Sequence, residues 1–233
     1  MSPDAVLVVL RGTPAALVEA EAVLTAAEAE RLRELRVEKR RRDWLLGRLA
    51  AKQAAAGLLG PRPLAGLQVE VTPGGAPRLH HAESGAPGPA ISISHSGGCA
   101  AALASHEPVG VDLEALQPMP AGAARYYLSE VERAWLAERP WGPHSELIAW
   151  ALKEAAYKAL GGAPGGLTRL TLAPASDANP GAWLAHDGGR LRGQWAAAAG
   201  FCLAVASADP AAGGPLQGLD LEGGLAVLAP ASP

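Results

Sequence analysis

Apolar positions along this chain recur with two different periods, and each period predicts a different kind of element. Residues 6–10 form a continuous apolar run, which predicts a buried strand near the N-terminus. Thr25 and Glu28 fit a capping box that starts a helix, and helical periodicity then continues to about residue 59. Gly60-Pro61 ends that pattern, and the thinning of apolar residues over 36–42 predicts a break within it. The first quarter of the chain is therefore predicted to be a strand followed by a long, interrupted helix.

The rest of the chain alternates between short strand-like runs and two further helical segments. Turn-like residues such as Ser96-Gly97-Gly98 separate the runs. Ser129 is the predicted N-cap of the first of the two helices. The predicted helices cover 129–138 and 144–160, and the predicted strands cover 67–71, 90–95, 99–105, 109–114, 167–172, 182–186, 190–195 and 201–206.

This order of elements predicts an α+β protein made of two similar lobes related by pseudo-two-fold symmetry. Each half runs from a strand through helices to further strands, although no repeat can be aligned in the sequence itself. We expect an N-terminal lobe over 1–109, a C-terminal lobe over 110–209 and a C-terminal tail over 210–233.

The composition is that of a globular protein with a sizeable core. Of its 233 residues, 49% are hydrophobic and 18% are charged. Uninterrupted apolar stretches stay well short of the roughly 18 residues that a membrane span needs. The two cysteines, Cys99 and Cys202, lie in apolar runs and are expected to be buried free thiols. We therefore expect a soluble, cytoplasmic protein that does not bind membranes.

The charge is unevenly distributed. The net charge of −3 argues against a general nucleic-acid binder, because such proteins carry basic residues over a broad surface. Even so, nine of the 20 Lys and Arg residues lie between Arg31 and Lys52. This cluster indicates either a confined anionic partner or simply a solvated helix face.

Two acidic residues follow a glycine in the predicted strand 109–114. In a strand, alternate side chains share a face, so Asp112 and Glu114 lie together while Val111 and Leu113 point the other way. Neighbouring carboxylates repel each other, and a bound hard cation is a common relief. A strand with its polar face in water is the alternative interpretation.

A third acidic residue and a lysine share one face of the predicted helix 144–160. Trp150, Glu154 and Lys158 are spaced four residues apart, with Tyr157 beside them. A surface ion pair between Glu154 and Lys158 is the alternative. The bordering tryptophan favours the interpretation that the pair is partly buried and has a functional role.

A histidine flanked by serines ends the predicted strand 90–95. Ser94, His95 and the following Gly97-Gly98 offer hydrogen-bond donors and close backbone approach to an oxyanion. A turn with a satisfied histidine is the alternative. A serine nucleophile is poorly supported, because the glycine-flanked nucleophile elbow is missing.

Taken together, these motifs resemble the 4′-phosphopantetheinyl transferase superfamily, in particular its long, pseudo-dimeric Sfp type. The resemblance covers roughly residues 24–206. Its carrying residues are Arg42-Asp43-Trp44-Leu45-Leu46-Gly47-Arg48, Ser94-His95-Ser96, Gly110-Val111-Asp112-Leu113-Glu114 and Trp150-Ala151-Leu152-Lys153-Glu154 with Lys158.

The resemblance implies a reaction. Phosphopantetheine would pass from coenzyme A to a serine of an apo acyl or peptidyl carrier protein, releasing adenosine 3′,5′-bisphosphate. Such enzymes serve fatty-acid, polyketide and nonribosomal peptide synthesis, and the pseudo-dimeric type would act as a monomer.

The resemblance also implies roles for individual residues. Asp112, Glu114 and Glu154 would hold Mg²⁺, with Mn²⁺ as a possible substitute. Glu154 would take the proton of the carrier serine and Lys158 would pair with the diphosphate, so Asp112, Glu154 and Lys158 form the expected catalytic set. Coenzyme A phosphates would meet Arg31, Arg48, Ser94, His95 and Lys158.

Two positions depart from the family pattern. The family often carries Gly-Lys-Pro before the Ser-His motif, whereas this chain has Gly75-Ala76-Pro77-Arg78, which loses the lysine contact or moves it to Arg78. Trp44 stands where some relatives have a small hydroxyl residue. Three rival functions remain: a metal-dependent phosphoryl transferase or diphosphate hydrolase acting on nucleotides, a non-catalytic module that binds coenzyme A or a carrier protein, and a small RNA-binding protein.

Overall fold

The computed structural model describes residues 4–138, 140–162, 165–174, 181–186, 189–208 and 225–228. The chain begins with β1 (Ala5–Arg11), α1 (Pro14–Ala22), α2 (Ala26–Glu34), α3 (Glu38–Leu59), β2 (Leu67–Val71), β3 (Pro77–His81), β4 (Ala90–Ser96) and β5 (Cys99–Ser105). It continues with β6 (Val109–Ala115), α4 (Glu130–Ala137), α5 (Ser145–Ala159), β7 (Thr171–Pro174), β8 (Gly181–His186), β9 (Gly189–Ala198), β10 (Phe201–Ser207) and β11 (Leu225–Leu228). Short 3-10 turns cover Leu64–Gly66, Ala123–Tyr126, Gly142–His144 and Leu167–Arg169.

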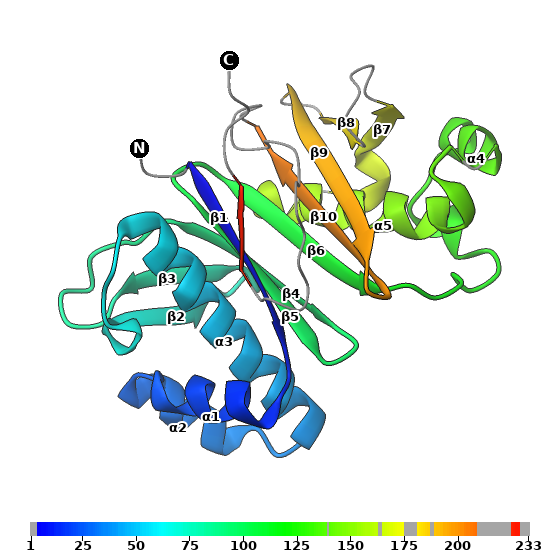
Figure 1. The fold of residues 1–233 in the computed structure, drawn as a ribbon. Helices are drawn as coiled ribbons and strands as arrows, with labels where there is room; N and C mark the ends of the chain where they lie inside the picture. Colours follow the sequence, from blue (N-terminus) through cyan, green and yellow to red (C-terminus); the bar gives the residue numbers. More distant parts are fainter. Residues whose placement is uncertain are drawn as a thin grey trace.

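Two sheets form the centre of the molecule, and each carries one long helix on its outer face (Figure 1). The first sheet has the order β11-β1-β5-β4, and α3 packs on it. The second has the order β6-β10-β9-β8-β7, and α5 packs on it. Between the sheets lies an apolar layer to which β1 and β5 contribute from one side and β6 and β10 from the other. The mixture of helix and mostly antiparallel sheet confirms the predicted α+β class.

The two halves of the chain repeat one topology. In the first half, β1 pairs antiparallel with β5, which pairs with β4. In the second half, β6 pairs antiparallel with β10, which pairs with β9. The hairpin of β2 and β3 has its counterpart in β7 and β8. Each half is therefore a similar lobe, as the order of sequence elements predicted.

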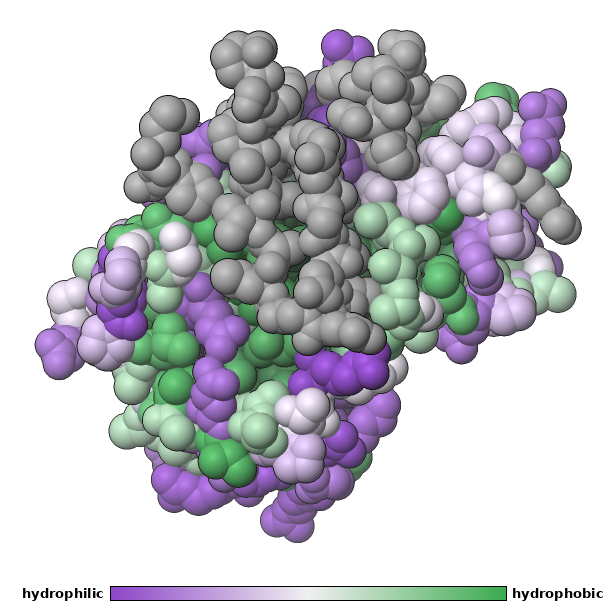
Figure 2. All heavy atoms as spheres, in the orientation of Figure 1, coloured by the Kyte–Doolittle hydropathy of each residue, from purple (hydrophilic) through white to green (hydrophobic). Residues whose placement is uncertain are grey.

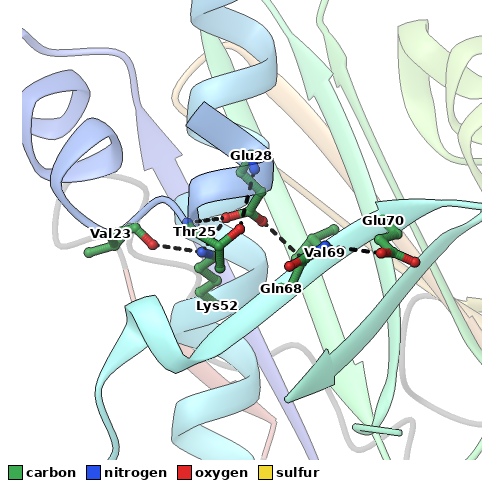
Figure 3. A network of polar contacts seen from close by, with 7 residues as sticks. All are labelled: Val23, Thr25, Glu28, Lys52, Gln68, Val69 and Glu70. Carbon is green, nitrogen blue, oxygen red and sulfur yellow. Dashed lines mark hydrogen bonds and ion pairs between the residues drawn. The ribbon is translucent and has the colours of Figure 1, made fainter. Parts of the chain in front are cut away.

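A buried polar network fixes α2 and α3 to the hairpin in the N-terminal lobe (Figure 3). Thr25 and Glu28 form the predicted capping box at the start of α2. The Glu28 carboxylate accepts from the Lys52 ammonium at 2.5 Å and from the backbone N–H of Val69 in β2 at 2.9 Å. Lys52 also donates to the Val23 carbonyl at 2.6 Å. One carboxylate thus links three elements of the lobe.

The C-terminal lobe contains the same network at matching positions. Ser129 and Glu132 form the capping box of α4. The Glu132 carboxylate accepts from Lys153 of α5 at 2.8 Å and from the backbone N–H of Leu172 in β7 at 2.6 Å. Lys153 donates to the Tyr127 carbonyl at 2.7 Å. The repeated network makes Lys52 and Lys153 equivalent residues of the two lobes.

The sequence predictions fail at the elements with the weakest periodicity. Helix α1 was missed, although Thr13 caps it and Pro14 occupies its first turn. Strand β3 was missed because only its Leu79 is buried. The predicted strand 167–172 is a 3-10 turn followed by β7. The domain limits at 109 and 209 stay predictions, and of the tail 210–233 only β11 lies within the described residues.

The basic residues of α2 lie on the outside of the molecule. Figure 2 shows hydrophilic residues along the lower edge of the visible face, over α1 and α2, as well as at other places on that face. Arg31 of α2 is exposed and pairs with Glu34.

Within the described residues, no helix combines the length and the apolar character needed to cross a bilayer.

Candidate functional site

The predicted carboxylates come together where β6 packs against α5. Val111 and Leu113 of β6 are buried in the apolar layer between the sheets. Asp112 and Glu114 therefore project from the opposite face of the strand, the face that α5 covers. Gly110 permits this approach, because a Cβ atom on it would lie 1.7 Å from the Ala155 carbonyl oxygen of α5. The glycine of the motif thus sets how closely strand and helix pack.

Asp112 is the most tightly held of the three carboxylates. Its side chain is buried, and its Oδ1 atom accepts from the Lys158 ammonium at 2.7 Å and from the Ser94 hydroxyl at 2.9 Å. Lys158 also donates to the Val111 carbonyl oxygen at 3.0 Å. The Oδ2 atom of Asp112 is buried and has no hydrogen-bond partner. A buried carboxylate oxygen in this state is poised to accept a further donor or a cation.

Glu114 and Glu154 complete an acidic cluster around Asp112. The Glu114 carboxylate accepts from the Trp150 indole at 3.1 Å and from the Ser96 hydroxyl at 3.3 Å. Burial and the charge of Asp112 raise the pKa of Glu114 above its usual range. Burial, followed by the charge of Asp112, likewise raises the pKa of Glu154, and Lys158 partly offsets this effect. Both shifts show that negative charge accumulates here in a poorly solvated place.

The N-terminal lobe serves as an internal comparison for this cluster. Strand register makes Asp112 and Glu114 equivalent to Val8 and Leu10 of β1. Counting along the helices from the paired lysines makes Glu154 equivalent to Gln53. The same fold thus forms in the N-terminal lobe without any of these carboxylates. Their presence in the C-terminal lobe therefore calls for a functional explanation.

A cavity of about 690 Å³ is lined in part by Lys158, the residue that contacts Asp112 of the acidic cluster. Elements of both lobes line it: the turn between β2 and β3, the start of β4, and the end of α5. Lys158 and Arg78 are its cationic lining residues, and Ser92 and Tyr157 add polar groups. Lys158 thus touches both the cavity and Asp112, and it can bind an anion in the cavity and a carboxylate beside it.

The remaining predicted phosphate-binding residues lie elsewhere. Ser94 is in the seam between β4 and β6, where its hydroxyl points at Asp112. His95 is the next residue of the same strand, so it faces the other side and is exposed. Arg31 and Arg48 belong to α2 and α3, and neither is a lining residue of the 690 Å³ cavity. The structure therefore brings together Arg78 and Lys158, but not the whole predicted set.

Arg48 has an unusual environment of its own. Its guanidinium is buried and stacks on the Trp44 ring at 4.3 Å from the ring centre. Burial lowers its pKa to about 10, Glu28 acts in the opposite direction, and Arg31 reinforces the decrease. Its Nε atom is buried without a hydrogen-bond partner. Arg48 thus faces α2 and the Glu28 network.

The donor set suits a hard divalent cation. Three carboxylates supply oxygen ligands of the kind that Mg²⁺ prefers, and Asp112 Oδ2 is an orphaned buried acceptor among them. As the side chains stand, no group of three or more His, Cys, Asp or Glu in the described part of the chain is arranged to hold a metal. The Lys158 ammonium supplies the positive charge at Asp112 instead. The chemistry of these three oxygen donors fits such a cation, and Asp112, Glu114 and Glu154 are the residues that would hold it.

Three contacts that shape the site and its lobe were not predicted from the sequence. The role of Gly110 as a spacer could have been inferred from a glycine that opens a strand opposite an alanine-rich helix. Ser96 was part of the motif, but its bond to Glu114 depends on how the lobes meet. The Glu132–Lys153 pair had no local signal beyond the capping box.

A comparison with protein families matches residues 108–206 to the model of the 4′-phosphopantetheinyl transferase superfamily. The matched segment runs from the start of β6 to the end of β10 and contains Asp112, Glu114, Glu154 and Lys158. This part of the chain is thus similar to the 4′-phosphopantetheinyl transferase superfamily.

Two proteins of this kind are similar to the chain over part of their length. The chain is 32% identical over 131 residues to the 4′-phosphopantetheinyl transferase Npt of Nocardia iowensis, a match that covers 53% of each chain. It thus spans about half the length of that transferase. The crystal structure of Thermotoga maritima holo-[acyl-carrier-protein] synthase (AcpS) matches with a TM-score of 0.37 and 25% identity, over 42% of this chain and 61% of that one.

Proposed function

We propose that this protein transfers 4′-phosphopantetheine from coenzyme A to a serine of an apo carrier protein, as a transferase of the Sfp type. The observation that carries the proposal is the position of Lys158, which touches the acidic cluster and lines the cavity at the same time. A diphosphate in that cavity would meet the Lys158 ammonium, which contacts Asp112 of the acidic cluster. Coenzyme A supplies such a diphosphate, and its phosphopantetheine arm would occupy the rest of the cavity.

The reaction exchanges one phosphorus–oxygen bond for another. The carrier serine oxygen bonds to the phosphorus that bears the pantetheine arm, and the bond from that phosphorus to the leaving phosphate breaks. Adenosine 3′,5′-bisphosphate departs with the bonding electron pair. Lys158 neutralises charge on the diphosphate oxygens, which is worth most in a water-poor site. Arg78 lines the same cavity and meets a further phosphate.

Glu154 is the proposed general base. A base works best when its pKa lies near the working pH, and burial together with Asp112 raises the pKa of Glu154 in that direction. Its carboxylate takes the proton that the serine hydroxyl loses. Asp112, Glu114 and Glu154 would together hold a Mg²⁺ ion or, in its place, Mn²⁺. When bound, the cation supplies neutralising charge at the phosphoryl oxygens.

The deciding experiment measures the mass of the carrier. The protein is incubated with coenzyme A, Mg²⁺ and an apo acyl or apo peptidyl carrier protein. We expect the carrier to gain the mass of the phosphopantetheine arm, and a chelator to prevent the gain. Gln53→Ala, at the position of the N-terminal lobe equivalent to Glu154, is the matched control and should keep the activity.

The principal alternative is a module that binds coenzyme A or a carrier protein without chemistry. It predicts retention of coenzyme A with no gain in carrier mass. The acidic cluster counts against it, because a binder has no use for charges that oppose one another in a buried place. No gain on any carrier of either class, with coenzyme A bound, would establish this alternative.

A further inference from the structure

The two lobes meet along β4 and β6, and serine side chains connect these strands. The backbone of β4 pairs with β5 and that of β6 with β10, so the two strands belong to different sheets. Ser92, Ser94 and Ser96 alternate along β4 and therefore point from one face of it. Each of the three hydroxyls makes a hydrogen bond to β6. We call these three residues the serine ladder.

The three hydroxyls of the serine ladder make different hydrogen bonds. Ser92 accepts from the backbone N–H of Val111 at 3.0 Å and so fastens strand to strand. Ser94 donates to the carboxylate of Asp112 at 2.9 Å. Ser96 does both, because it accepts from the backbone N–H of Ala115 at 3.1 Å and donates to Glu114 at 3.3 Å. Two of the rungs thus end on carboxylates of the acidic cluster.

The bond made by Ser96 has a defined direction. A serine hydroxyl has a single proton, and the backbone N–H of Ala115 can only donate. The proton of Ser96 is therefore free to point at Glu114, whose other oxygen accepts from the Trp150 indole. Glu114 is held from both sides, one donor coming from each lobe. Its position consequently depends on the docking of the lobes.

Without such donors the acidic cluster would spread apart. Asp112 and Glu114 lie two residues apart on one face of β6, so their negative charges repel each other. Repulsion drives flexible side chains away from one another and toward water. Hydrogen bonds from fixed hydroxyls oppose this movement and keep the carboxylate oxygens close enough to share a cation.

We propose that Ser94 and Ser96 are positioning residues that hold Asp112 and Glu114 ready for the divalent cation, so that cation binding depends on the seam between the lobes. The inference rests on the proposed function only in assuming that the acidic cluster binds a metal. It assigns the Ser94 hydroxyl to a carboxylate, whereas the sequence interpretation assigned it to a phosphate of coenzyme A. It also gives Ser96 a role beyond its place in the motif.

The test measures metal binding rather than turnover. Purified wild-type protein and variants are titrated with Mn²⁺ in the presence of saturating coenzyme A, and free Mn²⁺ is followed by electron paramagnetic resonance. We expect Ser96→Ala to weaken the Mn²⁺ dissociation constant by about 10- to 100-fold, as losses of second-sphere partners do at other metal sites. Ser96→Thr keeps a hydroxyl and should restore most of the affinity. Ser94→Ala should act in the same direction as Ser96→Ala.

One control separates positioning from simple loss of stability. Ser105→Ala removes another buried serine hydroxyl, whose bond goes to the Asp4 carbonyl and not to the acidic cluster. This variant should lower the unfolding temperature modestly and leave the Mn²⁺ affinity of the folded protein unchanged.

The outcomes distinguish this inference from the proposed function. If Ser96→Ala binds Mn²⁺ as tightly as wild type, or Ser105→Ala weakens binding equally, the positioning role is wrong even if carrier modification proceeds. If wild type binds no Mn²⁺, the inference also fails. If the carrier gains no mass but Mn²⁺ binding responds to Ser96 as expected, the positioning role stands and the proposed function fails.

Discussion

Replacing Gly110 with alanine is the sharpest test of how the structure assembles its acidic cluster. The added methyl group would lie 1.7 Å from the carbonyl oxygen of Ala155 and 2.8 Å from the backbone nitrogen of Ala159. Both atoms belong to the backbone of α5, so rotation of a side chain gives no relief. The helix as a whole must retreat from β6.

The size of the effect follows from that geometry. Carbon and oxygen need a separation of about 3.4 Å, so α5 must move by roughly 1.5–2 Å. Overpacking of this kind usually costs about 1–3 kcal/mol, and we expect the upper end because backbone atoms are in conflict. Glu154 and Lys158 move with the helix, away from Asp112. A misplacement of about 1 Å at an active site can reduce the rate roughly 100-fold.

Urea unfolding and carrier modification measure the two consequences separately. Gly110→Ala should lower the free energy of unfolding by about 3 kcal/mol, and the variant that remains folded should transfer at about one hundredth of the wild-type rate. Gly66→Ala is the control, because a Cβ atom there meets no neighbour within 4 Å. It should be neutral or slightly stabilising. A Gly110→Ala variant with wild-type stability and rate would refute the close packing of β6 on α5.

Two further substitutions test the charges of the C-terminal lobe. Glu154→Gln should abolish carrier modification yet raise stability on the order of 1 kcal/mol near neutral pH. Because the pKa of Glu154 is raised in the folded state, the wild-type protein loses stability as the pH rises through that pKa and Glu154 ionises. The glutamine side chain cannot ionise, so the variant avoids this loss. Its gain in stability should therefore disappear at acid pH, where Glu154 of the wild type is protonated. Near-normal turnover in this variant would contradict the role of general base. Lys153→Met leaves the buried Glu132 carboxylate without its counter-ion and should destabilise the protein by roughly 3–5 kcal/mol in urea unfolding. This loss should shrink as pH falls towards the ordinary carboxyl pKa, because a protonated Glu132 needs no counter-ion; a loss independent of pH would assign it to packing instead.

Much of the fold was accessible from the sequence because its signals are local. The capping box at Thr25, the N-cap at Ser129 and the helix end at Gly60 are confirmed. The first long helix is interrupted as predicted, but at residues 35–37 and not over 36–42. Such features depend on residues three or four positions apart, which meet in any helix that forms. The missed helix α1 is also local, and its Thr13-Pro14 start was a usable signal.

The sequence by itself also determined which side chains share a face. It placed Asp112 with Glu114, and Trp150 with Glu154 and Lys158, because strands repeat every two residues and helices every 3.6. Only the tertiary structure decided which faces meet: Lys158 beside Asp112, Ser96 against Glu114, and His95 turned away from the seam that Ser94 enters. These contacts depend on two features of the packing: the burial of the apolar layer between the two sheets, and the close approach of α5 to β6 that Gly110 allows. They join residues far apart in the chain, and no local pattern encodes them.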